Sequence, residues 1–280
     1  MKVVSGKVGA VNKLIVLFGA MLSLGLNAQV TLGPTVATFG VLAGSTVTNS
    51  GATFVVGNLG VSPGTAITGI NGIAPGGPGM VSGTIHSADA FALQAQNELT
   101  AAYNAAAGAA STATKTGDLG GQTLFPGVYT APSTTLMITG VLTLDAQGNP
   151  NAQFIFQVGS GLTTATGSGV LLINGAQPSN VFWQVGSSAT LGTSSSFSGN
   201  ILALASISLG TGVAIQGRAL ARTGAVTLLD NAITAPAGPG VTQPPAVTPA
   251  PSSLILVAIA LACVGIYQAR QRLLPPFRRS

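Results

Sequence analysis

The sequence predicts a mainly β protein, a three-faced β-solenoid with one long α-helix packed alongside. Three observations lead to this fold class. Apolar and polar residues alternate along short segments, one such pattern recurs with a period of 18, and a single stretch has helical spacing instead. Eighteen residues fit three short strands and three turns, so each coil would bury its inward side chains by stacking on the next coil.

The repeat is clearest in the C-terminal half of the chain. Residues 188–193 align with 206–211 at a step of 18, and a further step of the same size carries Leu209 to Thr227. Upstream, residues 154–160 match 181–187 at a step of 27, which is one 18-residue coil with a nine-residue insertion. Gly and Asn fall at the expected corners, where a positive φ is least costly.

We assign the three strands of each coil to three faces. The first face contains residues 181–185 and 199–203. The second contains 188–191 and 206–209, and the third contains 194–198 and 212–216.

One segment departs from the strand pattern. Residues 87–107 carry apolar side chains at helical spacing, with Ser87 as the expected N-cap, Asp89 in the first turn and Gly108 as the stop. We expect this helix to lie along the first face.

The first face suits the helix because Leu202 and Leu220 point outward there. Residues 64–83, which are rich in Gly and Pro, predict a loop or cap rather than a coil.

The two ends of the chain read as targeting segments. Residues 1–28 combine a basic start, an apolar run and a small-residue cleavage site, which predicts a secretory signal peptide; a retained N-terminal anchor is the alternative. The solenoid domain is expected over 29–235, a Pro-rich linker over 236–253, and a hydrophobic and basic tail over 254–280.

This tail resembles the PEP-CTERM sorting tail of Gram-negative bacteria, although the usual Glu between the prolines is Ala250 here. The resemblance implies a membrane-held tail that an exosortase-type enzyme processes at the cell surface; a plain membrane anchor is the alternative. The only cysteine, Cys263, lies in the tail, so the solenoid domain has no disulfide.

The charge of the chain excludes several classes of protein. Only 5% of the 280 residues are charged, against about 25% in ordinary globular proteins. The net charge of +5 divides into +3 in the signal, +4 in the tail and −2 in the body. The body therefore lacks the clustered basic residues of a nucleic-acid binder and the charge of a disordered segment.

Several stretches of the body resemble the microbial ice-binding protein family, a β-solenoid family with a flanking helix. The matching stretches are residues 39–49, 58–64, 118–129, 142–146, 154–160, 181–193 and 217–228. The resemblance covers residues 32–234. It implies a right-handed, discontinuous solenoid that is triangular in section, with N-terminal strands inserted between later coils, and a flat face that binds ice.

A Ser/Thr-rich face of a solenoid would present a regular array of hydroxyls to water. The candidate residues on the second face are Thr163, Ser188, Thr190, Ser206 and Ser208, and those near the N-terminus are Thr46 and Thr48. The third face offers Ser194, Ser196 and Ser198. The second face is slightly favoured, and the third stays open.

One departure from the family concerns a short motif. Strongly active relatives repeat Thr-Ala/Gly-x-Thr/Asn on the ice face, whereas this sequence has the motif once, at residues 68–71, in the expected cap.

Enzymatic chemistry finds little support in the sequence. Residues 60–64 fit the G-x-S-x-G pattern, but Pro63 removes an N–H that an oxyanion hole would need. His86 is the only histidine and has no second His or Cys for a metal site. The five carboxylates are spread along the body, without the close pair that a polysaccharide hydrolase needs.

We therefore expect a secreted, non-enzymatic ice-binding protein without a cofactor or metal, whose partner is ice or ordered water. An exopolysaccharide is a further expected partner outside the cell. The alternative is an adhesin or a structural protein of the extracellular matrix or biofilm that uses the same solenoid without affinity for ice.

Overall fold

The structure is a computed structural model, and it describes residues 29–73 and 76–236. The predicted signal peptide, nearly all of the Pro-rich linker and the whole C-terminal tail lie outside these residues. In the described part of the chain, no helix is both long and apolar enough to cross a membrane.

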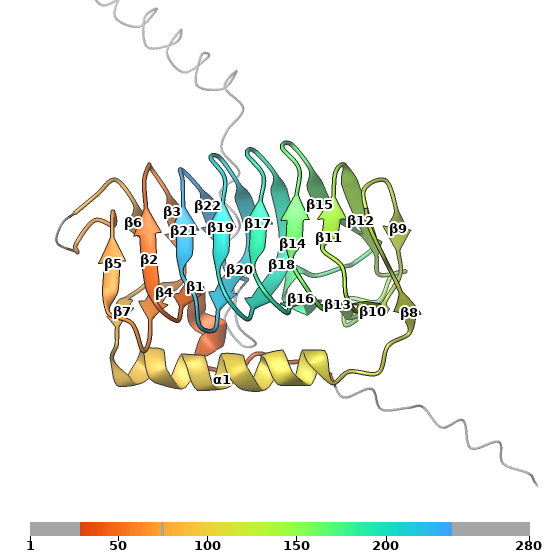
Figure 1. The fold of residues 1–280 in the computed structure, drawn as a ribbon, viewed down its shortest axis with the longest axis horizontal. Helices are drawn as coiled ribbons and strands as arrows, with labels where there is room; N and C mark the ends of the chain where they lie inside the picture. The colour runs from red at the N-terminus through yellow and green to blue at the C-terminus, as the bar shows by residue number, and fades with distance from the viewer. Residues whose placement is uncertain (1–28, 74–75, 237–280) are drawn as a thin grey trace, which may run out of the picture. The chain divides into compact units, whose positions relative to one another are not determined.

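The body consists of parallel strands in three stacks, joined by short turns (Figure 1). In order along the body, the first stack contains β8 (Ala113–Thr114), β10 (Gly127–Ala131), β13 (Phe154–Val158), β16 (Val181–Val185), the second half of β18 (Ser196–Ala203), the second half of β20 (Ala214–Ala221), β1 (Phe39–Ala43), β4 (Asn58–Val61) and β7 (Ile85–Ser87).

The second stack is a separate seven-stranded sheet. Its strands are, in spatial order, β11 (Leu136–Ile138), β14 (Leu162–Thr164), β17 (Ala189–Leu191), β19 (Ile207–Leu209), β21 (Val226–Leu228), β2 (Thr46–Asn49) and β5 (Ala66–Thr68). The third stack contains β9 (Thr123–Leu124), β12 (Val141–Asp145), β15 (Gly169–Ile173), the first halves of β18 and β20, β22 (Ala232–Thr234), β3 (Phe54–Val56) and β6 (Met80–Val81).

Two long strands, β18 and β20, run without a break from the third stack into the first. The bend falls at Gly199 and Gly217, which are paired neighbours with φ of +115° and +150°. A Cβ atom on Gly217 would lie 1.9 Å from the carbonyl oxygen of Gly199. The corner therefore needs glycine both for its backbone conformation and for the close approach of the two coils.

The interior between the stacks is apolar and closely packed. Trp183 is fully buried and stacks on Phe156, with ring centroids 3.9 Å apart and planes 7° from parallel. The ring of Phe197 also contacts the indole, with the centroids 5.1 Å apart and the planes tilted by 49°. Stacked coils bring equivalent residues of successive turns together, so the repeats seen in the sequence become columns of core side chains.

The N-terminal coil is out of sequence order in the stack. Strand β1 pairs with both β20 and β4, strand β2 with both β21 and β5, and strand β3 with both β22 and β6. The first coil of the chain thus lies between the last coil and the second one, as Figure 1 shows for β2 beside β21. This discontinuity agrees with what the family resemblance implies.

The segment over residues 64–83 corrects the expectation of a cap or loop. It contains β5 and β6, which continue the second and third stacks, and the described residues between these strands, 69–73 and 76–79, form a loop. Gly77 and Gly79 allow this loop to return close to the backbone of Gly69, because a Cβ at Gly77 would lie 2.4 Å from it. Gly77 and Gly79, whose composition predicts a loop, are thus needed because the chain passes close to the backbone of Gly69.

The single long helix, α1 (Ala90–Ala107), lies along the first stack as expected. Ala95, Leu99 and Tyr103 pack in one apolar cluster with Leu202 and Leu220 of the strands. The buried face of the helix also contains Ala92, Ala102 and Ala106. These small side chains let the helix lie close to the sheet.

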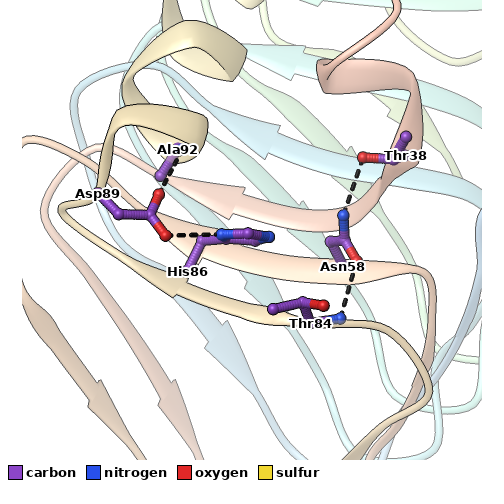
Figure 2. A network of polar contacts seen from close by, with 6 residues as sticks. All are labelled: Thr38, Asn58, Thr84, His86, Asp89 and Ala92. Atoms are coloured by element: carbon purple, nitrogen blue, oxygen red, sulfur yellow. Dashed lines mark hydrogen bonds and ion pairs between the residues drawn. The ribbon is translucent and has the colours of Figure 1, made fainter.

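The start of the helix differs from the expected start. Asp89, not Ser87, is the N-cap, and its carboxylate accepts a hydrogen bond of 2.7 Å from the Ala92 amide (Figure 2). Ser87 belongs to β7, and its hydroxyl donates to the carbonyl oxygen of Thr65. Gly108 is the C-cap, as predicted.

His86 takes part in this cap as a packed polar side chain. Its Nδ1 lies 2.7 Å from the Asp89 carboxylate, and its ring stacks on Phe91 at 4.6 Å. Desolvation raises the pKa of Asp89, but the hydrogen bond from Ala92 and the contact with His86 lower this pKa overall. The second set of contacts in Figure 2 ties β4 to its neighbours: Asn58 donates to the Thr38 hydroxyl and accepts from the Thr84 amide.

The short 3-10 helix η1 (Val36–Thr38) holds the N-terminal segment between α1 and the strands. Glu98 of α1 accepts hydrogen bonds from the amides of Thr35 and Val36 at 2.8 and 2.9 Å. At the other end, the buried Arg218 donates to the carbonyl oxygen of Ala37 at 2.6 Å. Burial lowers the pKa of Arg218 to about 10, so the guanidinium is still charged at neutral pH.

We predict that Glu98→Gln destabilises the protein at pH 7 but not at low pH. Desolvation raises the pKa of Glu98, yet hydrogen bonds from Val36, Gln94 and Thr35 lower this pKa overall, below its ordinary value of 4.5. The stabilisation is therefore present above about pH 4.5 and is lost as pH falls through the lowered pKa. Urea unfolding should give a free energy of unfolding lower by about 1 kcal/mol at pH 7.

The difference between the Glu98→Gln variant and the original chain should shrink as the pH falls below that window, because the original chain alone loses an ionised group there. A difference that stays constant down to pH 2 would contradict this role. Asn97→Ala, an exposed change on the same helix, is the control.

We also predict that Gly217→Ala destabilises the fold by about 3 kcal/mol or more, because it combines a strained backbone with overpacking against Gly199. The matched control is Gly140→Ala. A Cβ at Gly140 would meet its nearest neighbour at 3.9 Å, and its φ is ordinary. Thermal unfolding of both variants checks this, and equal melting temperatures would contradict the proposed corner constraint.

Candidate functional site

A straight row of hydroxyl side chains crosses the second stack. The strand register places each member directly opposite the next, in the order Thr163, Thr190, Ser208, Thr227, Thr48 and Thr68. We call these six residues the hydroxyl row. Since neighbouring strands lie about 4.8 Å apart, the row is about 24 Å long.

Alternation along each strand points the row outward. Ala189 and Leu191 on either side of Thr190 are buried, and so are Ile207 and Leu209 beside Ser208. Successive side chains of a strand point to opposite faces, so the residue between two core side chains points away from the core. Thr190, Ser208 and Thr48 are accordingly exposed, and the other three are partly exposed.

The hydroxyls of the row are not used by the fold. Within residues 29–73 and 76–236, none of the six forms a side-chain hydrogen bond with the protein. Thr164, next to Thr163, shows the contrast: it is buried, and its hydroxyl accepts from the Gly192 amide at 2.9 Å. Each hydroxyl of the row can therefore donate to and accept from water.

The strands that carry the row have no ionic side chains. None of the seven strands of the second stack contains Asp, Glu, Lys, Arg or His. Beyond Thr163 the register continues to the exposed Met137 and then, through an isolated bridge, to Asp118. Hydrogen bonds from the Thr139 hydroxyl and the Gly120 amide lower the pKa of Asp118, so this end of the row is marked by a carboxylate.

The structure separates the second-face candidates into two sets. Thr163, Thr190, Ser208 and Thr48 belong to the hydroxyl row. Ser188 and Ser206 lie just before strands β17 and β19, where Ser188 Oγ accepts from the Ser206 amide and Ser206 Oγ accepts from the Ala225 amide, both at 3.2 Å. These two serines support the corner between stacks.

Thr46 lies at the same edge of the stack as these serines. It is two residues before Thr48 and pairs with Ala66, so it has no hydroxyl neighbour on that side.

The third-face candidates do not form a row of their own. Ser194 lies in a turn with φ of +57°, and Ser198 is 6% exposed, with its hydroxyl donating to the carbonyl oxygen of Val170. Only Ser196 is exposed on a strand, and its neighbours across the stack are Gly169 and Ala214.

Large apolar side chains are exposed farther along the third stack. They are Phe54, Met80, Val141 and Leu171. Its outer surface is therefore mixed and uneven, and the three candidate serines do not form a row on it.

Two members of the row lie outside the set of candidates that the sequence suggests. A constant step of 18 aligns Thr227 with Leu209, but the structure pairs it with Ser208, a step of 19. The extra residue lies in the corner formed by residues 222–225, and a slip of one residue moves a side chain to the other face. The alternation in Val226, Thr227 and Leu228 is the signal that corrects the alignment.

The second of these members is Thr68. The sequence places it in an expected cap, within the single Thr-Gly-Ile-Asn motif. The pairing of β5 with β2 puts it next to Thr48 instead.

The remaining polar candidates are packed into the fold. Ser62 of the G-x-S-x-G pattern is 3% exposed, and it leads from strand β4 to strand β5 rather than to a helix. Among the described residues, no three His, Cys, Asp or Glu side chains are grouped as metal ligands would be. A groove of about 410 Å³ beside the end of α1 is lined by uncharged residues, among them Gln29, Thr112 and Gln153.

Comparisons with known proteins find a matching family and several similar chains. A family model described as Ice-binding-like matches residues 41–234. A protein of Nostoc sp. (strain HG1) named "Ice-binding protein" is 49% identical over 221 residues, which is 78% of this chain and 79% of that protein. "Ice-binding protein 1" of Shewanella frigidimarina is 36% identical over 71% of this chain and 25% of its own length.

Solved structures show the same fold. The crystal structure of an ice-binding protein from an Antarctic biological consortium is 47% identical, with a TM-score of 0.69, over 74% of this chain and 90% of that one. An ice-binding protein from the Antarctic ascomycete Antarctomyces psychrotrophicus is 39% identical, also with a TM-score of 0.69, over 74% of this chain and all of that one. The match over most of the solenoid, together with the identity to the Nostoc protein, shows that this chain belongs to the ice-binding-like family.

Proposed function

We propose that the protein binds ice and that the hydroxyl row on the second stack is the surface that does so. The observation that carries this proposal is the register of six unpaired hydroxyls on a stack whose strands have no charged residue. The names of the similar proteins support ice as the partner. They do not assign a surface on this chain, which rests on the geometry alone.

The physical basis is the ordering of water on a rigid, regular array. Each Thr offers a hydroxyl that bonds water and a methyl group that does not, repeated at the strand spacing of about 4.8 Å. Waters held by such an array already have fixed positions when they join a crystal, so little further ordering is required on binding. Ionic side chains would orient water around themselves, and their absence from these strands favours the ordered arrangement.

Adsorbed protein would block the growth of the crystal at that place, which gives antifreeze activity and inhibits ice recrystallisation. Such an activity serves the cell from outside, in agreement with the export predicted from residues 1–28. The adhesin or matrix alternative has no support from the similar proteins. Thermal hysteresis of the purified chain is the decisive measurement, and its absence at high protein concentration would remove the proposal.

Thr190 lies near the centre of the hydroxyl row. Thr190→Tyr should abolish nearly all thermal hysteresis, because a bulky ring in the middle of the row keeps its neighbours away from a flat crystal plane. Ser196→Tyr is the matched control: it places the same ring at an exposed strand position on the third stack. Both variants should keep the melting temperature of the original chain. Loss of activity in Ser196→Tyr alone would place the ice-binding surface on the third stack.

Met137 extends the register of the row at its Thr163 end. Met137→Thr adds a seventh hydroxyl in register with Thr163 and should raise thermal hysteresis measurably at equal protein concentration. Met80→Thr is the control, since Met80 is also exposed, at 54%, but lies on the third stack. An equal rise in both variants would indicate that a more polar exterior, rather than the length of the row, sets the activity.

A further inference from the structure

The chain contains two Asn-Gly pairs, Asn71–Gly72 and Asn174–Gly175, in exposed turns. An Asn followed by Gly is chemically vulnerable, because glycine has no side chain to hinder its own backbone nitrogen. That nitrogen can attack the side-chain amide carbon of the Asn before it. The two pairs share this sequence, so any difference between them must come from the structure around each.

The side chain of Asn71 is free. Its backbone amide donates to the carbonyl oxygen of Gly79 at 2.7 Å, which holds the main chain in place. Its side-chain amide, in contrast, has no hydrogen bond to any described residue. Around Gly72, with φ of +85°, a Cβ atom would meet nothing within 4 Å, so water has open access to this peptide unit.

The side chain of Asn174 is held. Its Nδ2 donates to a carboxylate oxygen of Asp145 at 2.9 Å, and the same oxygen accepts from the Gln147 amide at 2.8 Å. The carbonyl oxygen of Asn174 accepts from the Gly148 amide. For the amide carbon to reach the nitrogen of Gly175, the side chain would have to rotate away from a charge-assisted hydrogen bond.

We propose that Asn71–Gly72 is a site of spontaneous deamidation, whereas Asn174–Gly175 is protected by Asp145. The backbone nitrogen of Gly72 forms a bond to Cγ of Asn71, and the Cγ–Nδ2 bond breaks, so that ammonia leaves with the amide proton. The resulting succinimide ring is opened by water. Opening at Cγ gives aspartate, and opening at the main-chain carbonyl carbon gives isoaspartate, in which the chain runs through the side-chain carboxyl carbon.

The product carries a new negative charge three residues after Thr68, the last member of the hydroxyl row. The strands of this stack are otherwise free of charge. An effect of this carboxylate on ice binding rests on the proposed function. The deamidation itself does not rest on it, so the two can be tested separately.

The experiment follows the full chain during incubation in mildly alkaline buffer made with ¹⁸O-labelled water. Proteolytic peptides are separated, and mass spectrometry records the labelled oxygen in the peptides that contain Asn71 and Asn174. We expect label and an isoaspartate product at residue 71, with residue 174 unchanged over the same period. Equal conversion at both sites, or none at residue 71 while residue 174 converts, would overturn the proposal.

Two variants make the test specific to the structure. Asp145→Ala should raise the deamidation rate at Asn174 toward the rate at Asn71. Asn71 in the same molecule should keep its original rate and serves as the internal reference. Asn71→Gln should abolish conversion at position 71, because the longer side chain would have to close a less favoured six-membered ring. Circular dichroism before incubation shows whether each variant is folded. If Asn174 is unaffected in folded Asp145→Ala, Asp145 does not protect it.

Discussion

Each coil of this protein is held on the next by backbone hydrogen bonds between parallel strands, and this pairing sets the positions of side chains both inside and outside. The same register that stacks Trp183 on Phe156 aligns Thr190 with Ser208 on the outer surface. The described body contains no cysteine, so stability comes from this pairing and from the apolar columns that it creates. The alignment of outward side chains into rows is therefore a direct consequence of how the core is built.

The three stacks use this regularity differently. The first stack carries apolar residues on its outer side, such as Leu202 and Leu220, and α1 covers them. The second stack has small hydroxyl residues outside and is left open. The third carries side chains of unequal size, from Gly169 and Ala214 to Phe54 and Leu171. Only the second stack combines a continuous row of Ser and Thr, free hydroxyls and strands without charge, which is why the hydroxyl row is the favoured site.

Much of the fold followed from the sequence, because period-two alternation and helical spacing are local signals. The helix, its place on the first stack and the outward direction of Thr190 and Ser208 were predicted in this way. The helix start differs by two positions, because Ser87 and Asp89 are both good caps and the pairing of β7 with β4 takes Ser87 into a strand. Corners were harder, because a turn absorbs an extra residue without changing the strands on either side. The step from Ser208 to Thr227 is therefore longer by one position than the repeat of 18.

The out-of-order coil explains why the hydroxyl row could not be read in full from the repeat. Four of its members, Thr163, Thr190, Ser208 and Thr227, follow one another along the C-terminal half of the chain. Thr48 and Thr68 join them only because β2 pairs with β21 across a long separation in sequence. The helix makes this arrangement possible, since it carries the chain from β7 back along the first stack to β8 at the other end. The discontinuity thus lengthens the row by two of its six members, so the topology of the chain contributes to the candidate surface as directly as its threonines do.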